Sequence, residues 1–153
     1  RCIEPVEHQS WNLPGIRMWL DEAALPNTPA PLSFDVNGPW PERRYDAVFS
    51  ANTLHIMGWP EVERLFAGLP AILAPDAKLA IYGPFNVGGR HTSEGNAAFD
   101  ASLRAASPHR GLRDVEAVDA LARHAGLELV EDRAMPANNR CLVWRRPATA
   151  AAG

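Results

Sequence analysis

Two apolar runs flank an amphipathic segment in the middle of the sequence. The runs cover residues 45–52 and 78–85, and each stops abruptly at polar or glycine residues. From near Pro60, apolar residues between the runs recur at helical spacing, namely Val62, Leu65, Phe66, Leu69, Ile72 and Leu73. The pattern predicts a strand–helix–strand unit whose right-handed crossover makes the strands parallel. Pro70 predicts a kink or division of this helix near Gly68.

Shorter patterns precede this unit. Residues 2–7 predict a strand that ends at Glu7, although Pro5 has no N–H and argues against regular pairing there. An apolar stripe predicts a helix over residues 13–24. A proline-rich loop then leads to a short strand-like run at residues 32–36.

Two further helices are predicted after the central unit. Ser93 is a typical N-cap, and Asp114 is a good cap for a second helix. Gly126 stands where a left-handed glycine commonly ends a helix, so the second helix is expected to stop just before it.

The C-terminal part predicts a hairpin. Residues 127–130 and 141–144 are strand-like, and the short link between them favours antiparallel pairing. The alanine-rich tail over residues 147–153 is expected to be disordered. The order of elements predicts an α/β fold with a mostly parallel sheet and a C-terminal antiparallel hairpin, forming one domain over residues 1–146.

Composition narrows the classes of function. The chain has 153 residues, of which 46% are hydrophobic, an ordinary globular balance. Its net charge of -3 argues against nucleic acid or an anionic membrane as a partner. No apolar run approaches the roughly 18 residues of a membrane span. Cys2 and Cys141 are too few for a disulfide framework, so a cytoplasmic location is expected. The histidines lack metal-ligand spacing, and no metal is expected.

Polar side chains follow the two central runs. Ligands of parallel sheets bind beyond the carboxyl ends of the strands, so the site is expected near Ser50, Asn52, His55 and Tyr82. An imidazole with an ordinary pKa of about 6.5 suits a proton acceptor, although His55 could instead cap the next helix or pack on Trp59. Asn52 could orient a substrate or cofactor, or simply end the strand.

Two loops carry further candidates. Arg90 and His91 lie in a glycine-flanked segment that could fold over a substrate, and Arg90 would favour an anionic one. A solvated surface loop explains the same residues. The amides of Asn138 and Asn139 could contact a substrate, but turn geometry explains them as well.

Several motifs together resemble one family of class I S-adenosylmethionine-dependent methyltransferases, a methyltransferase-like family whose defining domain is of unknown function. The similarity runs from about Ile3 to Arg146. It is carried by Asn-Thr-Leu-His-Ile at 52–56, Tyr-Gly-Pro-Phe at 82–85, Gly-Arg-His-Thr at 89–92, Asn-Ala-Ala-Phe-Asp at 96–100, Arg-Asp at 113–114 and Met-Pro-Ala-Asn-Asn at 135–139.

This resemblance implies a Rossmann-like fold and a place for S-adenosylmethionine. Glu7 matches the acidic residue that ends the second strand and holds the ribose hydroxyls. Asp35 matches the residue that receives the adenine amino group, with the Val36 backbone beside the ring. The end of the fourth strand, from Ser50 to Asn52, would line the methionine portion.

The sequence departs from the family in one respect. The first strand, the glycine-rich loop and a helix should precede Glu7, and Gly88-Gly89 lacks the spacing to replace that loop. The chain is therefore expected to be an N-terminally truncated methyltransferase acting on a small-molecule acceptor, with its oligomeric state left open. The alternative is an inactive remnant that serves as an interaction module or needs a partner to complete its sheet.

Overall fold

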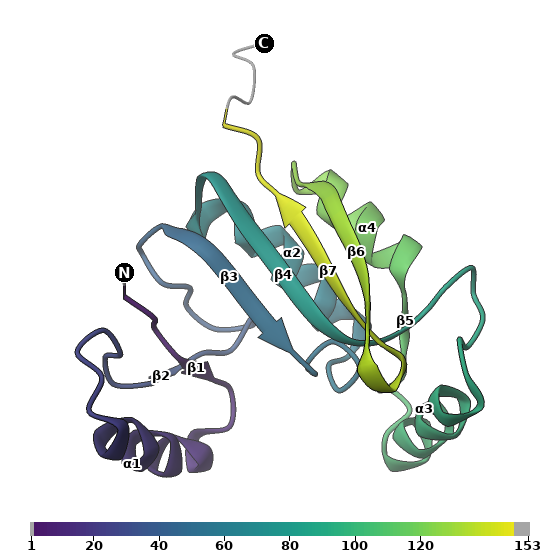
Figure 1. Cartoon of the computed structure of the whole chain (residues 1–153), viewed down its shortest axis with the longest axis horizontal. Helices are drawn as coiled ribbons and strands as arrows, with labels where there is room; N and C mark the ends of the chain where they lie inside the picture. Colours follow the sequence, from purple (N-terminus) through teal and green to yellow (C-terminus); the bar gives the residue numbers. More distant parts are fainter. Residues whose placement is uncertain (1, 149–153) are drawn as a thin grey trace. The chain divides into compact units, whose positions relative to one another are not determined.

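The strands form two separate sheets, and each sheet lies in a different unit of the chain (Figure 1). The structure is a computed structural model that describes residues 2–148. Its two units are Arg1–Pro41 and Glu42–Gly153. Most of the tail predicted over residues 147–153 lies outside the described residues, and the single domain over residues 1–146 stays a prediction.

The first unit holds one helix and two very short strands. Strand β1 (Val6–Glu7) pairs in parallel with β2 (Leu32–Ser33), and between them lie the 3-10 turn η1 (Ser10–Asn12) and helix α1 (Leu13–Ala23). The predicted helix is confirmed, with Pro14 in its first turn, where a missing N–H costs nothing.

Both predicted strands of this unit are longer than the observed ones. Pro5 lacks an N–H, and only its carbonyl takes part in pairing, accepting from Leu32 N at 3.0 Å. The second run ends early because Asp35 starts a turn, in which its carbonyl accepts from Gly38 N at 2.9 Å. Regular pairing is therefore confined to two residues on each strand.

The second unit is built on the predicted strand–helix–strand. Strand β3 (Tyr45–Ala51) runs parallel to β4 (Leu73–Asn86), and helix α2 (Trp59–Ile72) connects them. Ser50 pairs with Ile81 in this register. The expected division of the helix near Gly68 is wrong, because the helix continues through Pro70, in its last turn, to Ile72.

The remaining strands extend the sheet as a hairpin. Strand β6 (Glu128–Met135) pairs antiparallel with β7 (Asn139–Arg145) across the 3-10 turn η2 (Pro136–Asn138), which confirms the predicted hairpin. The strand order is β3-β4-β7-β6, and the short strand β5 (Arg113–Asp114) pairs with the end of β4.

Two more helices complete this unit, α3 (Glu94–Ala106) and α4 (Val115–His124). Ser93 caps α3 as predicted, since its Oγ accepts from Asn96 N at 3.0 Å. Asp114 stands at the N-cap of α4, but its side chain makes no capping hydrogen bond. Gly126 adopts the expected left-handed conformation after α4, with φ of 79°.

The core of the second unit lies between one face of the sheet and helices α2 and α4, which lie behind the strands in Figure 1. Phe66 of α2 packs edge-on against Trp144 of β7 with ring centroids 6.0 Å apart. The Trp144 indole donates to Asp119 Oδ1 at 2.9 Å, so its polar atom is satisfied within the core. On the edge strand β3, in contrast, the Phe49 side chain is 68% exposed.

The arrangement confirms the mixed α/β, Rossmann-like fold that the sequence predicts. Within residues 2–148, no helix combines the length and apolar content needed to cross a membrane.

Candidate functional site

Two carboxylates lie at one edge of the small sheet in the first unit. Glu7 is the last residue of β1, and Asp35 follows the end of β2. Because Glu7 pairs in parallel with Ser33, both acids lie beyond the carboxyl ends of neighbouring strands. Glu7 Oε1 accepts from Gln9 N at 2.9 Å.

The Asp35 carboxylate is held in its ionised form. Its Oδ1 accepts from Asn37 N at 2.8 Å, and its Oδ2 lies 3.4 Å from His8 Nε2. The backbone N–H of Asn37 has the largest effect and lowers the pKa of Asp35; burial opposes it, and nearby His8 lowers the pKa further. The next residue, Val36, accepts from the Trp40 indole through its carbonyl at 3.2 Å, which orders this turn.

A hollow of about 450 Å³ in the same unit lies away from these acids. Its lining comes from α1 and the proline-rich loop, including Leu20, Leu25 and Pro29. Neither Glu7 nor Asp35 is among the residues that line it, and both acids are half-buried.

In the second unit, Asn52 and His55 converge at the carboxyl ends of β3 and β4. The backbone N–H of Asn52 donates to Tyr82 O at 2.9 Å, and Asn52 has a left-handed φ of 56°. A Cβ added to Gly83 would lie 3.6 Å from Asn52 Oδ1 and 3.8 Å from His55 Nδ1. The structure therefore brings together two of the three predicted catalytic residues beside a position that has no side chain.

His55 is a buried and uncharged imidazole. It is 6% exposed and packs edge-on against Phe99 with ring centroids 5.4 Å apart. It does not pack on Trp59, which instead lies under the Arg113 guanidinium, and the N-cap of α2 is Gly58. Burial lowers the pKa of His55, and the positive charge of Arg113 lowers it further. The ring is thus neutral near pH 7 and able to accept a proton.

Arg113 braces the turn that carries His55. Its guanidinium donates to the carbonyls of Leu54, Met57 and His109 at 3.3, 2.5 and 2.9 Å. Burial lowers the pKa of Arg113, and neighbouring Arg104 also lowers it, while Asp100 opposes them. The sequence motif contained Arg113, but its bracing role depends on contacts between residues more than fifty positions apart.

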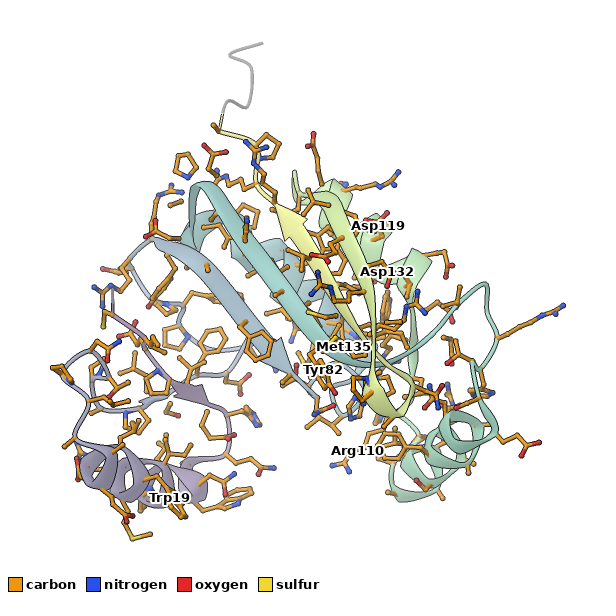
Figure 2. All side chains as sticks on the ribbon, in the orientation of Figure 1. Trp19, Tyr82, Arg110, Asp119, Asp132 and Met135 are labelled. Atoms are coloured by element: carbon orange, nitrogen blue, oxygen red, sulfur yellow. The ribbon has the colours of Figure 1, made fainter. Side chains whose placement is uncertain are left out.

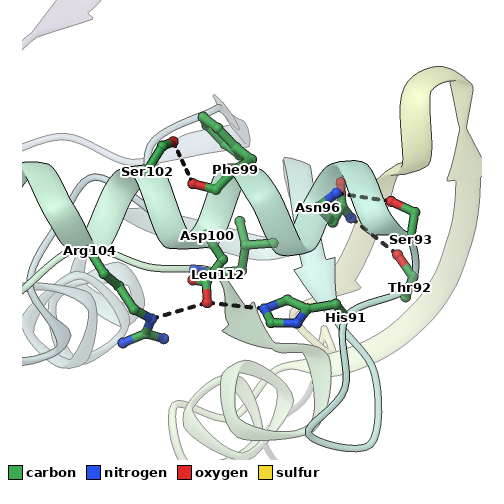
Figure 3. Close-up of polar contacts among 9 residues, drawn as sticks. All are labelled: His91, Thr92, Ser93, Asn96, Phe99, Asp100, Ser102, Arg104 and Leu112. Atoms are coloured by element: carbon green, nitrogen blue, oxygen red, sulfur yellow. Dashed lines mark hydrogen bonds and ion pairs between the residues drawn. The ribbon is translucent and has the colours of Figure 1, made fainter.

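Asp100 organises a polar cluster beside this turn (Figure 3). Its Oδ2 lies 3.0 Å from both Arg104 Nε and His91 Nε2, and its Oδ1 accepts from Leu112 N at 2.8 Å. Burial would raise the pKa of Asp100, but the hydrogen bonds from Leu112, Arg104 and His91 hold that pKa below its usual value. The adjoining Gly111 N donates to His55 O at 3.0 Å, so the cluster supports the His55 backbone.

The loop after β4 is anchored at both ends. Val87 and Arg90 exchange backbone hydrogen bonds at 3.0 and 3.1 Å, and Gly88 N donates to Glu116 Oε1 at 3.0 Å. His91 joins the Asp100 cluster, whereas the exposed Arg90 side chain has no bonding partner in the part of the chain that the structure describes. A catalytic role for Arg90 stays a prediction.

The hairpin residues are explained by turn geometry. Asn138 has a left-handed φ of 56°, and its carbonyl accepts from the Asn96 side chain at 3.2 Å. Asn139 donates its side-chain amide to Pro136 O at 3.1 Å. Figure 2 places Met135, next to this turn, at the same end of the sheet as Tyr82.

Ser50 is half-buried on β3, and its hydroxyl shares a hydrogen bond with the hydroxyl of Thr53. The predicted cofactor residues Glu7, Asp35 and Val36 lie in the first unit, whereas Ser50 lies in the second. That these four residues bind one cofactor stays a prediction. Across residues 2–148, no three His, Cys, Asp or Glu side chains gather in a way that could hold a metal.

Sequence reasoning missed Asn86, because it ended the second apolar run at residue 85. Asn86 is the last residue of β4 and is only 8% exposed. Its Oδ1 is buried and has no hydrogen-bond partner among residues 2–148. A single polar residue directly after a long apolar run was the available signal.

Comparison with known proteins gives the family and supports the fold. A family model described as "Protein of unknown function (DUF938)" matches residues 1–146. The chain belongs to this family. The description of this family states no activity, so a link to methyltransferases depends on the structural likeness.

Solved structures similar to this DUF938 member include named methyltransferases. The S-adenosylmethionine-dependent methyltransferase SibL has a TM-score of 0.78 at 19% identity, over 95% of this chain and 43% of that one. The mitomycin 7-O-methyltransferase MmcR has a TM-score of 0.78 at 18% identity, over 92% and 40%. An O-methyltransferase family protein from Burkholderia thailandensis has a TM-score of 0.77 at 17% identity, over 88% and 41%.

The DUF938 chain thus spans less than half the length of these three proteins. At these identities the likeness establishes a shared class I methyltransferase fold and leaves the activity to be argued from the residues.

Proposed function

We propose that this chain takes part in S-adenosylmethionine-dependent methyl transfer to a small-molecule acceptor. The observation that carries the proposal is the pair of carboxylates, Glu7 and Asp35, at the tips of parallel strands in a fold shared with solved methyltransferases. Ligands of such sheets bind at this edge. Ribose hydroxyls and an adenine amino group are donors, which carboxylates accept well.

The residues present fit an adenosine. One oxygen of each carboxylate holds a backbone N–H two residues further on, which fixes the side chain. The second oxygen of Asp35 lies 3.4 Å from Nε2 of the exposed His8. In this proposal Glu7 holds the ribose, Asp35 the adenine amino group and the Val36 backbone the ring.

The acceptor requires orientation and, where it is a protonated hydroxyl, removal of a proton. S-adenosylmethionine, when bound, supplies a methyl group already activated by its sulfonium. His55 suits the proton transfer because its lowered pKa keeps the imidazole neutral at physiological pH. Its ring nitrogens make no hydrogen bond within residues 2–148, so the unprotonated nitrogen of the neutral ring remains able to accept one. Asn52 would orient the acceptor, and Arg90 would attract an anionic part of it.

Calorimetric titration with S-adenosylmethionine tests the cofactor site. Replacing Glu7 by Gln or Asp35 by Asn should each weaken binding about tenfold or more, because a hydrogen bond to a charged group is lost. Asp132→Asn is the matched control, since Asp132 pairs with Arg140 in the hairpin and should leave affinity unchanged. Wild-type affinity in both site variants would contradict the assignment.

Transfer of a labelled methyl group to a panel of small phenols tests the base. His55→Gln should lower the rate by about 10²-fold or more with little change in cofactor affinity, because general base catalysis contributes on that order. An unchanged rate in this variant would remove His55 from the mechanism.

A second candidate is a non-catalytic interaction module that needs a partner strand. Strand β3 lies at the end of the order β3-β4-β7-β6, so one of its edges is unpaired within that sheet. Unpaired edges offer backbone donors and acceptors to another chain. Absence of cofactor binding, together with capture of a second strand at β3, would favour this candidate.

A further inference from the structure

Asn86 has a buried polar atom with no use in the fold. Its side chain is at the carboxyl end of β4, three residues beyond Gly83, and its Oδ1 is unpaired in the described chain. A buried polar atom without a partner destabilises a protein, and such atoms in native structures commonly indicate a missing ligand or a water. The Oδ1 atom of Asn86 is therefore suited to accept a hydrogen bond from a ligand.

Asp114 lies directly beside it. In the parallel pairing of β4 with β5, Asn86 is the register partner of Asp114. Register partners lie about 5 Å apart and point to the same face of a sheet. The half-buried Asp114 side chain makes no capping hydrogen bond, and no other partner for it is found among residues 2–148.

We propose that Asn86 and Asp114 bind a hydrogen-bond-donating group, a hydroxyl or an amine, of the small-molecule acceptor. The inference rests on the proposed function and narrows its substrate class. The Asn86 carbonyl and the Asp114 carboxylate are two hydrogen-bond acceptors side by side. They favour a ligand group that donates a hydrogen bond, and the carboxylate repels an anion. The pair lies three residues beyond Gly83 on β4, at the carboxyl end of the strand, where ligands of parallel strands bind.

The first test compares two equally buried asparagines by thermal unfolding. Asn96 is 6% exposed, and its side chain donates to Thr92 Oγ1 at 3.1 Å and to Asn138 O at 3.2 Å. Asn96→Leu should lower Tm by about 3–8 °C, because it leaves these acceptors unpaired. Asn86→Leu should leave Tm unchanged or raise it, because it removes an unpaired amide at similar volume.

The second test observes the side-chain amide of Asn86 by NMR in the isotopically labelled chain, without cofactor or methyl transfer. Phenol should shift this resonance in a saturable way, while anisole, which lacks the donor, and benzoate, which is anionic, should not. Titration with benzylamine shows whether the pair binds an amine as well as a hydroxyl. In Asp114→Asn the shift should need several-fold more phenol, because a charged acceptor has become neutral.

The outcomes separate this inference from the proposed function. A drop in Tm for Asn86→Leu as large as for Asn96→Leu would overturn it, because Asn86 would then be satisfied by a structural water. Equal shifts with phenol and anisole, or a shift with benzoate alone, would also overturn it. Cofactor binding measured by calorimetry stands or falls independently of these results.

Discussion

Replacing Asp100 by Asn should remove a large part of the stability of the second unit. The carboxylate receives hydrogen bonds from Leu112 N, Arg104 and His91, and it is 7% exposed. An asparagine keeps one oxygen for Leu112 but turns an NH₂ toward two groups that are themselves donors. The substitution therefore removes the interactions that use the charge and leaves the backbone bond in place.

The size of the loss follows from these contacts. A hydrogen bond to a charged group contributes about 1.5–3 kcal/mol. The Arg104 side chain is 52% exposed and the His91 side chain 38%, so solvent screening reduces both contributions. Asp100→Asn should therefore lower the free energy of unfolding by about 2 kcal/mol. Asp76→Asn, which breaks an exposed and solvent-screened pair with Arg145, should lower the free energy of unfolding much less.

Urea unfolding followed by tryptophan fluorescence measures both variants, and pH supplies a second readout. Hydrogen bonds hold the pKa of Asp100 below its usual value of 3.8. The stabilisation is therefore complete above 3.8 and disappears as pH falls through the lowered pKa of the folded chain. The gap between wild type and Asp100→Asn should be constant near neutral pH and close in acid. Equal losses for Asp100→Asn and Asp76→Asn at neutral pH would refute this account.

Three further outcomes are expected. Gly83→Ala should change the free energy of unfolding by less than about 1 kcal/mol, because the new Cβ would make ordinary van der Waals contacts with Asn52 and His55, at 3.6 and 3.8 Å. The same variant should slow methyl transfer, because the methyl group fills the space between these two side chains. Gly111→Ala should cost about 2 kcal/mol or more in the same denaturation assay, because Gly111 has a φ of 154°, which an alanine rarely adopts, and the new Cβ would also displace the Arg104 guanidinium from Asp100. The stability advantage of wild type over His55→Gln should be larger at about pH 8 than at about pH 5, because the lowered pKa of His55 makes the unfolded chain bind its proton first. Chemical denaturation at the two pH values checks this, and an advantage that grows in acid would contradict the assigned pKa direction.

The sequence predicted the elements whose apolar spacing is strongest. Helix α2 and strand β3 lie where the periodicity places them, and the hairpin of β6 and β7 was indicated by its short link. Strand β4 is longer than its apolar run, because pairing with Tyr45 begins at Leu73 and an irregular left-handed residue, Asp76, is absorbed within the strand. Such an extension depends on the neighbouring strand, which no local pattern contains.

The sequence predicted only those site residues whose positions follow from the topology of the sheet. The rule that ligands bind at carboxyl ends of strands pointed to Asn52 and His55, and the structure brings both to Gly83. The role of Arg113 was not predictable, because it donates to carbonyls more than fifty positions away in the chain. The role of Asp100 depends on the loops that bring His91 and Leu112 back to helix α3, which no local pattern contains. Asn86 was missed because an unpaired buried atom is a property of packing, which the sequence does not display.

These long-range contacts explain why a buried histidine at this position can be suited to catalysis. The residues around His55 are held from two sides, by Arg113 bonding the carbonyls of Leu54 and Met57, and by Gly111 bonding the carbonyl of His55 itself. Gly111 in turn precedes Leu112, which Asp100 holds. Every one of these bonds uses backbone atoms, so the turn is fixed while the imidazole stays free of hydrogen bonds within the described residues. A base that is oriented by its backbone and neutralised by burial requires little reorganisation before it accepts a proton.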